Sequence, residues 1–313
     1  MQYLPPKFLF NGHLETIYPA FFRKVNFRQP VQEKIFTPDD DFLELDCYRR
    51  ESTNCVIISH GLEGNSSRAY VRGMARAFFN IGYDVIAYNL RGCGQTLNKQ
   101  KRFYHSGASD DLAVVVEHAT NYYESIFLIG FSLGGNLTLK YLGERGLNSL
   151  IKKAVVVSVP IHLHSCSLKL AKPENYFYKI RFLNSLKKKV RSKHTLTKDY
   201  PPSLLKEIKS LLHFDDVVTA PLHGFKNAMD YYNQCSSTKY ISQIQTPTLI
   251  INAVNDPFLT EECFSNLKLN SNQFVTAILP RFGGHVGFTL LKNSGIYWSE
   301  KMAIKFVDET ESN

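Results

Sequence analysis

Short apolar runs alternate with stretches of helical periodicity through the middle of the chain. Residues 55–60 and 83–88 are apolar, and between them apolar side chains recur at helical spacing from Tyr70 to Ile81. Further apolar runs cover residues 125–129, 153–159, 247–252 and 274–279. Apolar strands separated by helices are buried on both faces, so the pattern predicts an α/β fold with a mostly parallel, doubly wound sheet.

Two regions do not show this alternation of apolar runs and helical stretches. Residues 33–50 alternate strictly, with Leu43 and Leu45 on one face and Glu44 between them, which predicts an antiparallel hairpin at one edge of the sheet. Residues 161–225 are basic, polar and only partly helical in pattern. We interpret them as a cap or lid inserted above the strand ends, although a peripheral decoration would show the same composition.

Residues 130–134 read Gly-Phe-Ser-Leu-Gly and stand between an apolar run and a helical pattern. Strand, G-x-S-x-G and helix in this order is the context of a nucleophile elbow, a sharp turn that lifts a serine above the sheet. The glycines remove Cβ atoms where strand and helix cross, and the helix N-terminus favours developing negative charge. We therefore interpret Ser132 as a nucleophile, although glycine and serine are also common in ordinary loops.

A serine nucleophile needs a base, and the chain order for this arrangement is serine, acid, histidine. His285 lies in a glycine-rich loop after the last apolar run, and Asp256 follows the preceding run. Because open α/β sheets place their sites at the carboxyl ends of the strands, we predict a triad of Ser132, Asp256 and His285. The alternative acids are Asp215 and Asp216, and the alternative histidines are His60, His105 and His223.

Acyl transfer also needs two backbone donors for the oxyanion. The amide of Leu133 follows the nucleophile directly, and the amide of Leu62 lies in the His60–Gly64 loop after an early strand. We predict that these two amides form the oxyanion hole. Glu63 and Arg91 are candidates for an ion pair behind the same loop.

Basic residues cluster in one stretch of the chain. The formal net charge is +9, and much of the excess lies between Lys179 and Lys193. We interpret this stretch as a solvated helix face; weak contact with an anionic membrane surface is the functional alternative. A nucleic-acid module would interleave aromatic and basic residues on a recognisable fold, so we expect no nucleic-acid partner.

The six cysteines are irregularly spaced and form no C-x-x-C pair. This pattern indicates reduced thiols in a cytosolic protein and gives no support for a metal site. The N-terminal residues lack the basic start and apolar core of a signal peptide, and no apolar run reaches membrane-spanning length. We therefore expect a cytoplasmic protein.

The motifs together resemble the α/β-hydrolase superfamily, and within it the YheT-like hydrolases, relatives of abhydrolase-domain lipases and yeast medium-chain ester synthases. The similar segments are residues 12–17, 60–64, 89–94, 104–107, 130–136, 214–217, 223–225, 255–257 and 284–285. The resemblance implies one α/β-hydrolase domain over residues 1–313 and a serine esterase that uses Ser132, Asp256 and His285 without metal or cofactor. It also implies short- to medium-chain esters or lipids as substrates.

Serine at the elbow favours acyl transfer over the epoxide and halide chemistry that needs a carboxylate there. We expect a carboxylic ester hydrolase. The alternatives are an alcohol O-acyltransferase with the same acyl-enzyme and a catalytically silent binding scaffold. His105 and Asp110 have the His-x4-Asp spacing of an acyltransferase motif, which we interpret as structural because Ser109 and Asp110 begin a helix.

Overall fold

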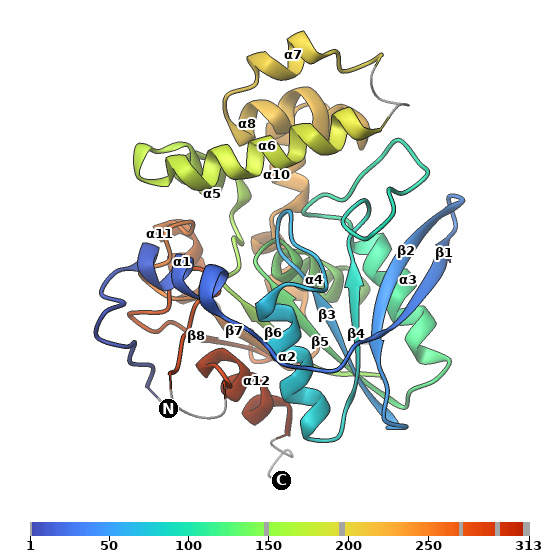
Figure 1. Cartoon of the computed structure of the whole chain (residues 1–313), viewed down its shortest axis with the longest axis vertical. Coiled ribbons are helices and arrows are strands. Elements are labelled where there is room, and N and C mark those ends of the chain that lie inside the picture. The colour runs from blue at the N-terminus through green and yellow to red at the C-terminus, as the bar shows by residue number, and fades with distance from the viewer. Residues whose placement is uncertain (1, 147–149, 194–197, 269–271, 292–294, 309–313) are drawn as a thin grey trace.

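The computed structural model describes residues 2–146, 150–193, 198–268, 272–291 and 295–308. Within these ranges eight strands form one sheet in the spatial order β1-β2-β4-β3-β5-β6-β7-β8 (Figure 1). The strands are β1 (Val31–Thr37), β2 (Asp41–Tyr48), β3 (Asn54–Ser59), β4 (Asp84–Asn89), β5 (Ser125–Phe131), β6 (Ile151–Val157), β7 (Thr248–Ile251) and β8 (Val275–Ile278).

Only β2 runs against its neighbours in this sheet of described residues, since it pairs antiparallel with both β1 and β4 and the remaining pairs are parallel. The predicted mostly parallel sheet with an antiparallel N-terminal edge is thereby confirmed. The strand boundaries differ from the predicted runs by one or two residues. Strand β6 spans Ile151–Val157 and ends two residues before the predicted run does, because Ser158 adopts a φ of 55° that turns the chain out of the sheet.

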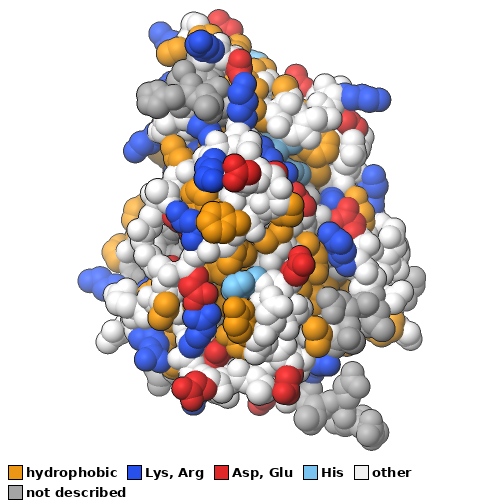
Figure 2. Space-filling model, turned by 90° about the vertical axis from the view of Figure 1, so that its right-hand side faces the viewer, with side chains coloured by type: hydrophobic (Ala, Val, Ile, Leu, Met, Phe, Trp, Pro, Cys, Tyr) orange, Lys and Arg blue, Asp and Glu red, His pale blue; other side chains and the backbone are white. Residues whose placement is uncertain are grey.

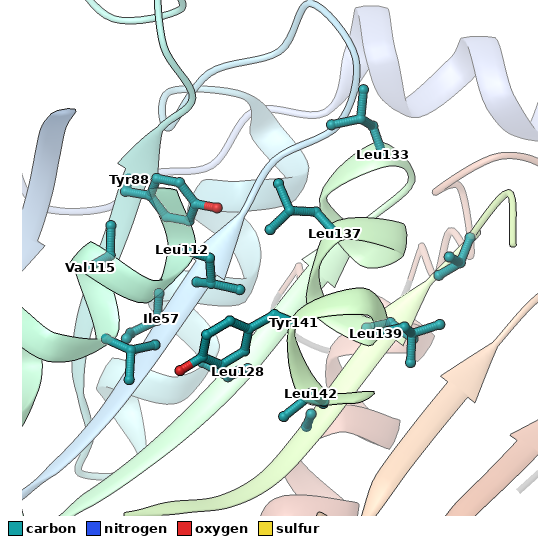
Figure 3. Close-up of a cluster of buried hydrophobic side chains, with 14 of the residues drawn as sticks. Ile57, Tyr88, Leu112, Val115, Leu128, Leu133, Leu137, Leu139, Tyr141 and Leu142 are labelled. Atoms are coloured by element: carbon teal, nitrogen blue, oxygen red, sulfur yellow. The ribbon is translucent and has the colours of Figure 1, made fainter. Parts of the chain in front are cut away.

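Helices cover both faces of the sheet, as apolar strands require. The N-terminal helix and those flanking the sheet are α1 (Gly12–Phe22), α2 (Ala69–Asn80), α3 (Ser109–Thr120), α4 (Leu133–Arg145), α11 (Glu261–Lys268) and α12 (Trp298–Asp308). Helices α2 and α12 pack on one face and α3 and α4 on the other. Leu112 of α3, Leu137 and Tyr141 of α4, and Ile57 and Leu128 of the sheet form one buried cluster (Figure 3). This packing fixes α4, and with it the turn that precedes its first residue.

A helical segment connects β6 to β7. Most of it lies above the carboxyl ends of the strands, at the top of Figure 1, whereas residues 237–243 pack against α4 beside the sheet. Its elements are α5 (Leu163–Ala171), η1 (Pro173–Asn175), α6 (Tyr176–Ser192), α7 (Pro202–Glu207), α8 (Leu211–Phe214), η3 (Asp215–Thr219), α9 (Ala220–Leu222), α10 (Ala228–Cys235), η4 (Ser237–Lys239) and η5 (Ile241–Gln243). The residues that we interpret as an insertion, 161–225, form α5 to α9. They have a small core of their own, built around Leu183, Leu186, Leu205 and Phe214.

All six cysteine side chains are buried and carry free thiols. Over the described ranges, no helix has both the length and the apolar character needed to cross a membrane.

Candidate active site

Ser132 occupies the turn between β5 and α4 with φ 52° and ψ −119°. A non-glycine residue in this region stores about 1–3 kcal/mol of backbone strain, which the surrounding structure must hold. The crossing is tight: a Cβ at Gly130 would lie 2.6 Å from the Cα of Gly135, and a Cβ at Gly134 would lie 2.5 Å from the carbonyl oxygen of His60. The chain therefore forms a nucleophile elbow whose glycines have the steric role that the motif predicts.

Hydrogen bonds connect the three side chains that we predict as a triad. Nε2 of His285 lies 2.9 Å from Oγ of Ser132, and Nδ1 lies 2.9 Å from Oδ2 of Asp256. The other oxygen of Asp256 accepts from the amide of Phe258 at 2.8 Å, and the carboxylate is buried. A carboxylate at Nδ1 holds the proton there and leaves Nε2 free to accept from the serine hydroxyl.

Helix α1 fastens the loops that carry the acid and the histidine. The amide of His285 donates to Oγ1 of Thr16 at 2.8 Å. The carboxylate of Glu15 accepts from the amide of Gly283, and from the side chain of Asn255 at 3.1 Å. Glu15 is completely buried, and this burial raises its pKa. Neither α1 residue could be given a role from its position in the sequence; the signal available was the motif at residues 12–17.

Replacing Glu15 with alanine is expected to loosen both loops. The Gly283 amide would lose its acceptor, and a buried unpaired donor costs about 1–3 kcal/mol. A small displacement of His285 from Ser132 is expected to lower kcat by about 10- to 100-fold. Urea unfolding and steady-state kinetics on a water-soluble ester measure the two effects, with the exposed Glu117→Ala as control. Wild-type stability and kcat in Glu15→Ala would contradict this role.

The two predicted oxyanion donors border the same cavity as Ser132. Leu133 is the first residue of α4, so its amide has no acceptor within the helix. In the loop after β3, the amide of Glu63 donates to the hydroxyl of Tyr104 at 2.9 Å. Among the described residues, no acceptor forms a hydrogen bond with the amide of Leu62 or with that of Leu133. Both amides can therefore receive an oxyanion.

Glu63 does not pair with Arg91, so that prediction is wrong. The guanidinium of Arg91 instead binds carboxylates that approach from the β1–β2 hairpin and from α3: Asp39, Asp41 and Asp111. Glu63 accepts from Nζ of Lys189 at 2.7 Å and from the hydroxyl of Tyr104 at 2.8 Å. Burial opposes ionisation of Glu63, but the Lys189 ammonium and the hydrogen bonds from Ser185 and Tyr104 together outweigh it, and the pKa of Glu63 is lowered. The ion pair fastens α6 to the oxyanion loop.

The prediction that the basic stretch Lys179–Lys193 is a solvated helix face holds for only part of its residues. Lysines 187, 189 and 193 point inward: Lys187 donates to the Ile208 carbonyl at 2.6 Å, and Lys193 donates to Oδ1 of Asn98 at 3.0 Å. Other basic residues of the stretch, including Arg181 and Lys188, are exposed. Lys189, through Glu63, and Lys193, through Asn98, hold α6 on the sheet domain, whereas Lys187 binds within the helical segment itself. The sequence pattern alone did not indicate these contacts.

The alternative histidines lie outside the triad. His60 is fully buried, and its Nε2 accepts from the amide of Leu90 at 3.1 Å. Burial lowers the pKa of His60 to about 4, so it is a neutral residue that holds the loop. His105 does not bond to Asp110, which pairs with Arg102 at 2.6 Å. The His-x4-Asp spacing therefore reflects no acid–base pair. Helix α3 does begin at Ser109, but its hydroxyl donates to Glu144 on α4 instead of capping α3.

A cavity of about 390 Å³ opens beside Ser132 and His285 and extends under the helical segment. Ligand cavities range from about 300 to 1,000 Å³. The apolar side chains along its walls include Leu163, Leu170, Phe182, Leu186, Val190, Leu211, Phe214, Val218, Leu222 and Phe258. An acyl chain would be removed from water here, and the serine hydroxyl stands at one wall.

Of the two alternative acids, Asp215 lines this cavity and Asp216 does not. Asp215 accepts from Thr219 Oγ1 and from the Tyr232 hydroxyl, both at 2.6 Å, and burial raises its pKa to about 6. Asp216 accepts from the amide of Ala228 at 2.9 Å. Asp256, and neither of these, holds Nδ1 of His285.

The raised pKa of Asp215 predicts a pH-dependent stability. Its folded pKa of about 6 lies above the ordinary value of 3.8, so the folded state binds more protons between these values. The stabilising contribution is complete below about pH 4 and is lost as pH rises through about 6. Relative to Asp215→Asn, wild-type unfolding free energy should fall by about 1–3 kcal/mol from about pH 4 to pH 7. Urea unfolding at both pH values measures this, and parallel pH profiles would contradict it.

The comparisons with known proteins agree with this fold. A family model described as "alpha/beta hydrolase fold" matches residues 54–285. The strand order, the elbow and the bonded serine, histidine and aspartate define an α/β hydrolase. The chain belongs to the α/β-hydrolase fold family.

Similar proteins are named as ester-cleaving enzymes. The chain is 31% identical to "Putative esterase YheT" of Escherichia coli K12, over 92% of this chain and 87% of that protein. It is 28% identical to human phospholipase ABHD3, over 91% of this chain and 73% of that protein. The resemblance to YheT-like hydrolases is confirmed. The esterase Pf2001 of Pyrococcus furiosus, 19% identical, shares the fold with a TM-score of 0.61 over 91% of this chain and 95% of its own.

Proposed function

We propose that the protein is a serine hydrolase that cleaves carboxylic esters, either of short- to medium-chain acyl groups or of lipids, through an acyl-enzyme on Ser132. The observation that carries the proposal is the bonded series Ser132–His285–Asp256 at the wall of an apolar cavity. Similar proteins named an esterase, a phospholipase and a monoacylglycerol lipase support the class of reaction.

In the first half of the reaction, Oγ of Ser132 attacks the ester carbonyl while Nε2 of His285 takes its proton. The carbonyl oxygen becomes an oxyanion that receives hydrogen bonds from the amides of Leu62 and Leu133. Asp256 stabilises the imidazolium. When the tetrahedral intermediate collapses, the bond to the alcohol oxygen breaks, the imidazolium returns its proton to that oxygen, and the acyl group stays on Ser132.

In the second half, water takes the place of the departed alcohol. His285 accepts a proton from this water, whose oxygen attacks the acyl carbonyl, and the same two amides hold the second oxyanion. Collapse releases the carboxylic acid and returns the proton to Ser132. The apolar lining favours substrates whose acyl part can be buried, at about 0.8 kcal/mol for each methylene removed from water.

A fluorophosphonate probe and a panel of p-nitrophenyl esters of increasing acyl length test the proposal. We expect labelling of Ser132 and a kcat/KM that rises with acyl length until the cavity is filled. Absence of labelling in folded protein, together with no turnover across the panel, would favour the catalytically silent scaffold instead.

Hydrolysis and alcohol acyl transfer share the acyl-enzyme and differ in the acceptor. The product ratio of acid to ethyl ester, measured with added ethanol, separates them. We expect acid to exceed ester at modest ethanol concentration. An excess of ethyl ester would make the protein an alcohol O-acyltransferase.

A further inference from the structure

The cavity has a rim made of residues that line it and are also exposed to solvent. These residues are Ile17, Ala20, Phe21, Arg68, Phe177 and Arg181. None of the six, all in the described part of the chain, is acidic. Phe21 is 74% exposed and Phe177 is 84% exposed. Phenylalanine side chains are usually buried, so two that stand in solvent at one cavity mouth need an explanation.

The rim is formed by α1, by the beginning of α6 and by Arg68, which directly precedes α2; α1 lies below α6 on the left in Figure 1. The ring of His13 on α1 stacks on that of Tyr178 on α6 with centroids 5.8 Å apart. Further large apolar side chains on the same segments are exposed, among them Phe10 (72%), Phe22 (67%) and Tyr176 (52%). The apolar surface therefore continues outward from the cavity mouth across two neighbouring elements.

Basic residues outnumber acidic ones among the exposed side chains of the two segments that carry this apolar surface. The exposed basic residues of segments 7–24 and 172–181 are Lys7, Lys24, Lys172 and Arg181, with Lys179 partly exposed; Glu174 is their exposed acidic residue. The face around β1 differs, because acidic and basic side chains alternate on it (Figure 2). Ion pairs there include Lys99–Asp40 at 3.3 Å and Arg102–Asp110 at 2.6 Å.

We propose that this rim docks the enzyme on the surface of an anionic lipid bilayer. Phe21 and Phe177 would enter the boundary between headgroups and acyl chains, and Arg181 and the surrounding lysines would contact lipid phosphates. The occupant is a bilayer because exposed aromatic side chains lie at the mouth of an apolar cavity, and the segments that carry them also carry exposed cations. A lipid chain could pass from bilayer to cavity without crossing water. This goes beyond the proposed chemistry, since binding does not require turnover.

The basic stretch alone would not provide this contact. Three of its lysines are used inside the molecule, as described above for Lys187, Lys189 and Lys193. The docking surface instead combines the beginning of α6 with α1, which lies more than a hundred residues earlier in the chain.

Sedimentation with large unilamellar vesicles tests the inference, using Ser132→Ala protein so that no lipid is consumed. Vesicles of phosphatidylcholine are compared with equimolar phosphatidylcholine and phosphatidylglycerol. We expect tighter binding to the anionic vesicles, weakened about tenfold by Phe21→Ser and again by Phe177→Ser. Phe36→Ser, which removes an equally exposed phenylalanine from β1 (69%), is the matched control and should bind as before.

Three results would overturn the inference: no sedimentation with anionic vesicles, equal losses in Phe36→Ser and the rim variants, or gel filtration that shows a dimer which only the rim variants dissociate. The last result would make the rim a contact between two copies.

Labelling of Ser132 in otherwise wild-type protein by the fluorophosphonate probe is measured separately. If the protein does not bind vesicles but Ser132 is labelled, the docking inference is wrong and the proposed function stands. If Ser132 is not labelled but the protein binds vesicles, the proposed function is wrong and the docking inference stands.

Discussion

Ser132→Ala protein is expected to lose ester turnover by about 10⁴- to 10⁶-fold and to lose fluorophosphonate labelling completely. Without the hydroxyl no acyl-enzyme can form, and only the oxyanion donors and the cavity remain to accelerate attack by water. Steady-state hydrolysis of a p-nitrophenyl ester and gel fluorescence of the probe measure the two losses.

The fold of this variant should survive, because alanine keeps the Cβ and the positive φ of 52° at the elbow is held by glycine-mediated packing of β5 against α4. Unfolding free energy is expected within about 0.5–1 kcal/mol of wild type. Ser203→Ala, which removes an exposed hydroxyl on α7, is the control and should keep full activity. Residual turnover near the wild-type rate would remove Ser132 from the mechanism.

The second large effect is expected for His285→Ala, with kcat/KM reduced by about 10³- to 10⁶-fold. The variant leaves Ser132 without the acceptor 2.9 Å away and leaves the carboxylate of Asp256 without its donor. The loop should keep its place, because its contact with Thr16 uses the backbone amide of residue 285 and not the imidazole.

The pH–rate profile and kcat/KM of His285→Ala measure this effect, and circular dichroism checks the fold. His213→Ala, an exposed histidine on α8, is the matched control. An unchanged rate in His285→Ala would place the general base elsewhere, and a matching loss in His213→Ala would indicate a nonspecific effect on folding.

Local sequence was enough to identify the elbow and the sheet. Period-2 and period-3.6 patterns are local, so residues 54–59, 84–89 and 125–131 could be recognised as strands without knowledge of their neighbours. The position of Ser132 follows for the same reason, since the strand, the two glycines and the helix are all adjacent in the chain. The chain order of the acid and the histidine then pointed to Asp256 and His285.

The partners of buried charges were decided only by the tertiary structure. Glu63 and Arg91 lie 28 positions apart, yet each binds side chains from other elements: Lys189 for the first, and Asp41 and Asp111 for the second. The support of the histidine loop by Glu15 spans 268 positions. Ion pairs and buried hydrogen bonds are satisfied by whichever group the fold brings within about 3 Å, and spacing in the sequence carries no information about that.

By itself, the sequence determined which elements form and which serine is raised above the sheet, because propensity, periodicity and turn chemistry act between neighbouring residues. Only the folded molecule decided how large the cavity is, which lysines of α6 turn inward, and that Phe21 and Phe177 meet at one rim. Most of those features depend on contacts between residues far apart in the sequence, such as Lys189 and Glu63 at 126 positions, and such contacts form only when the chain packs.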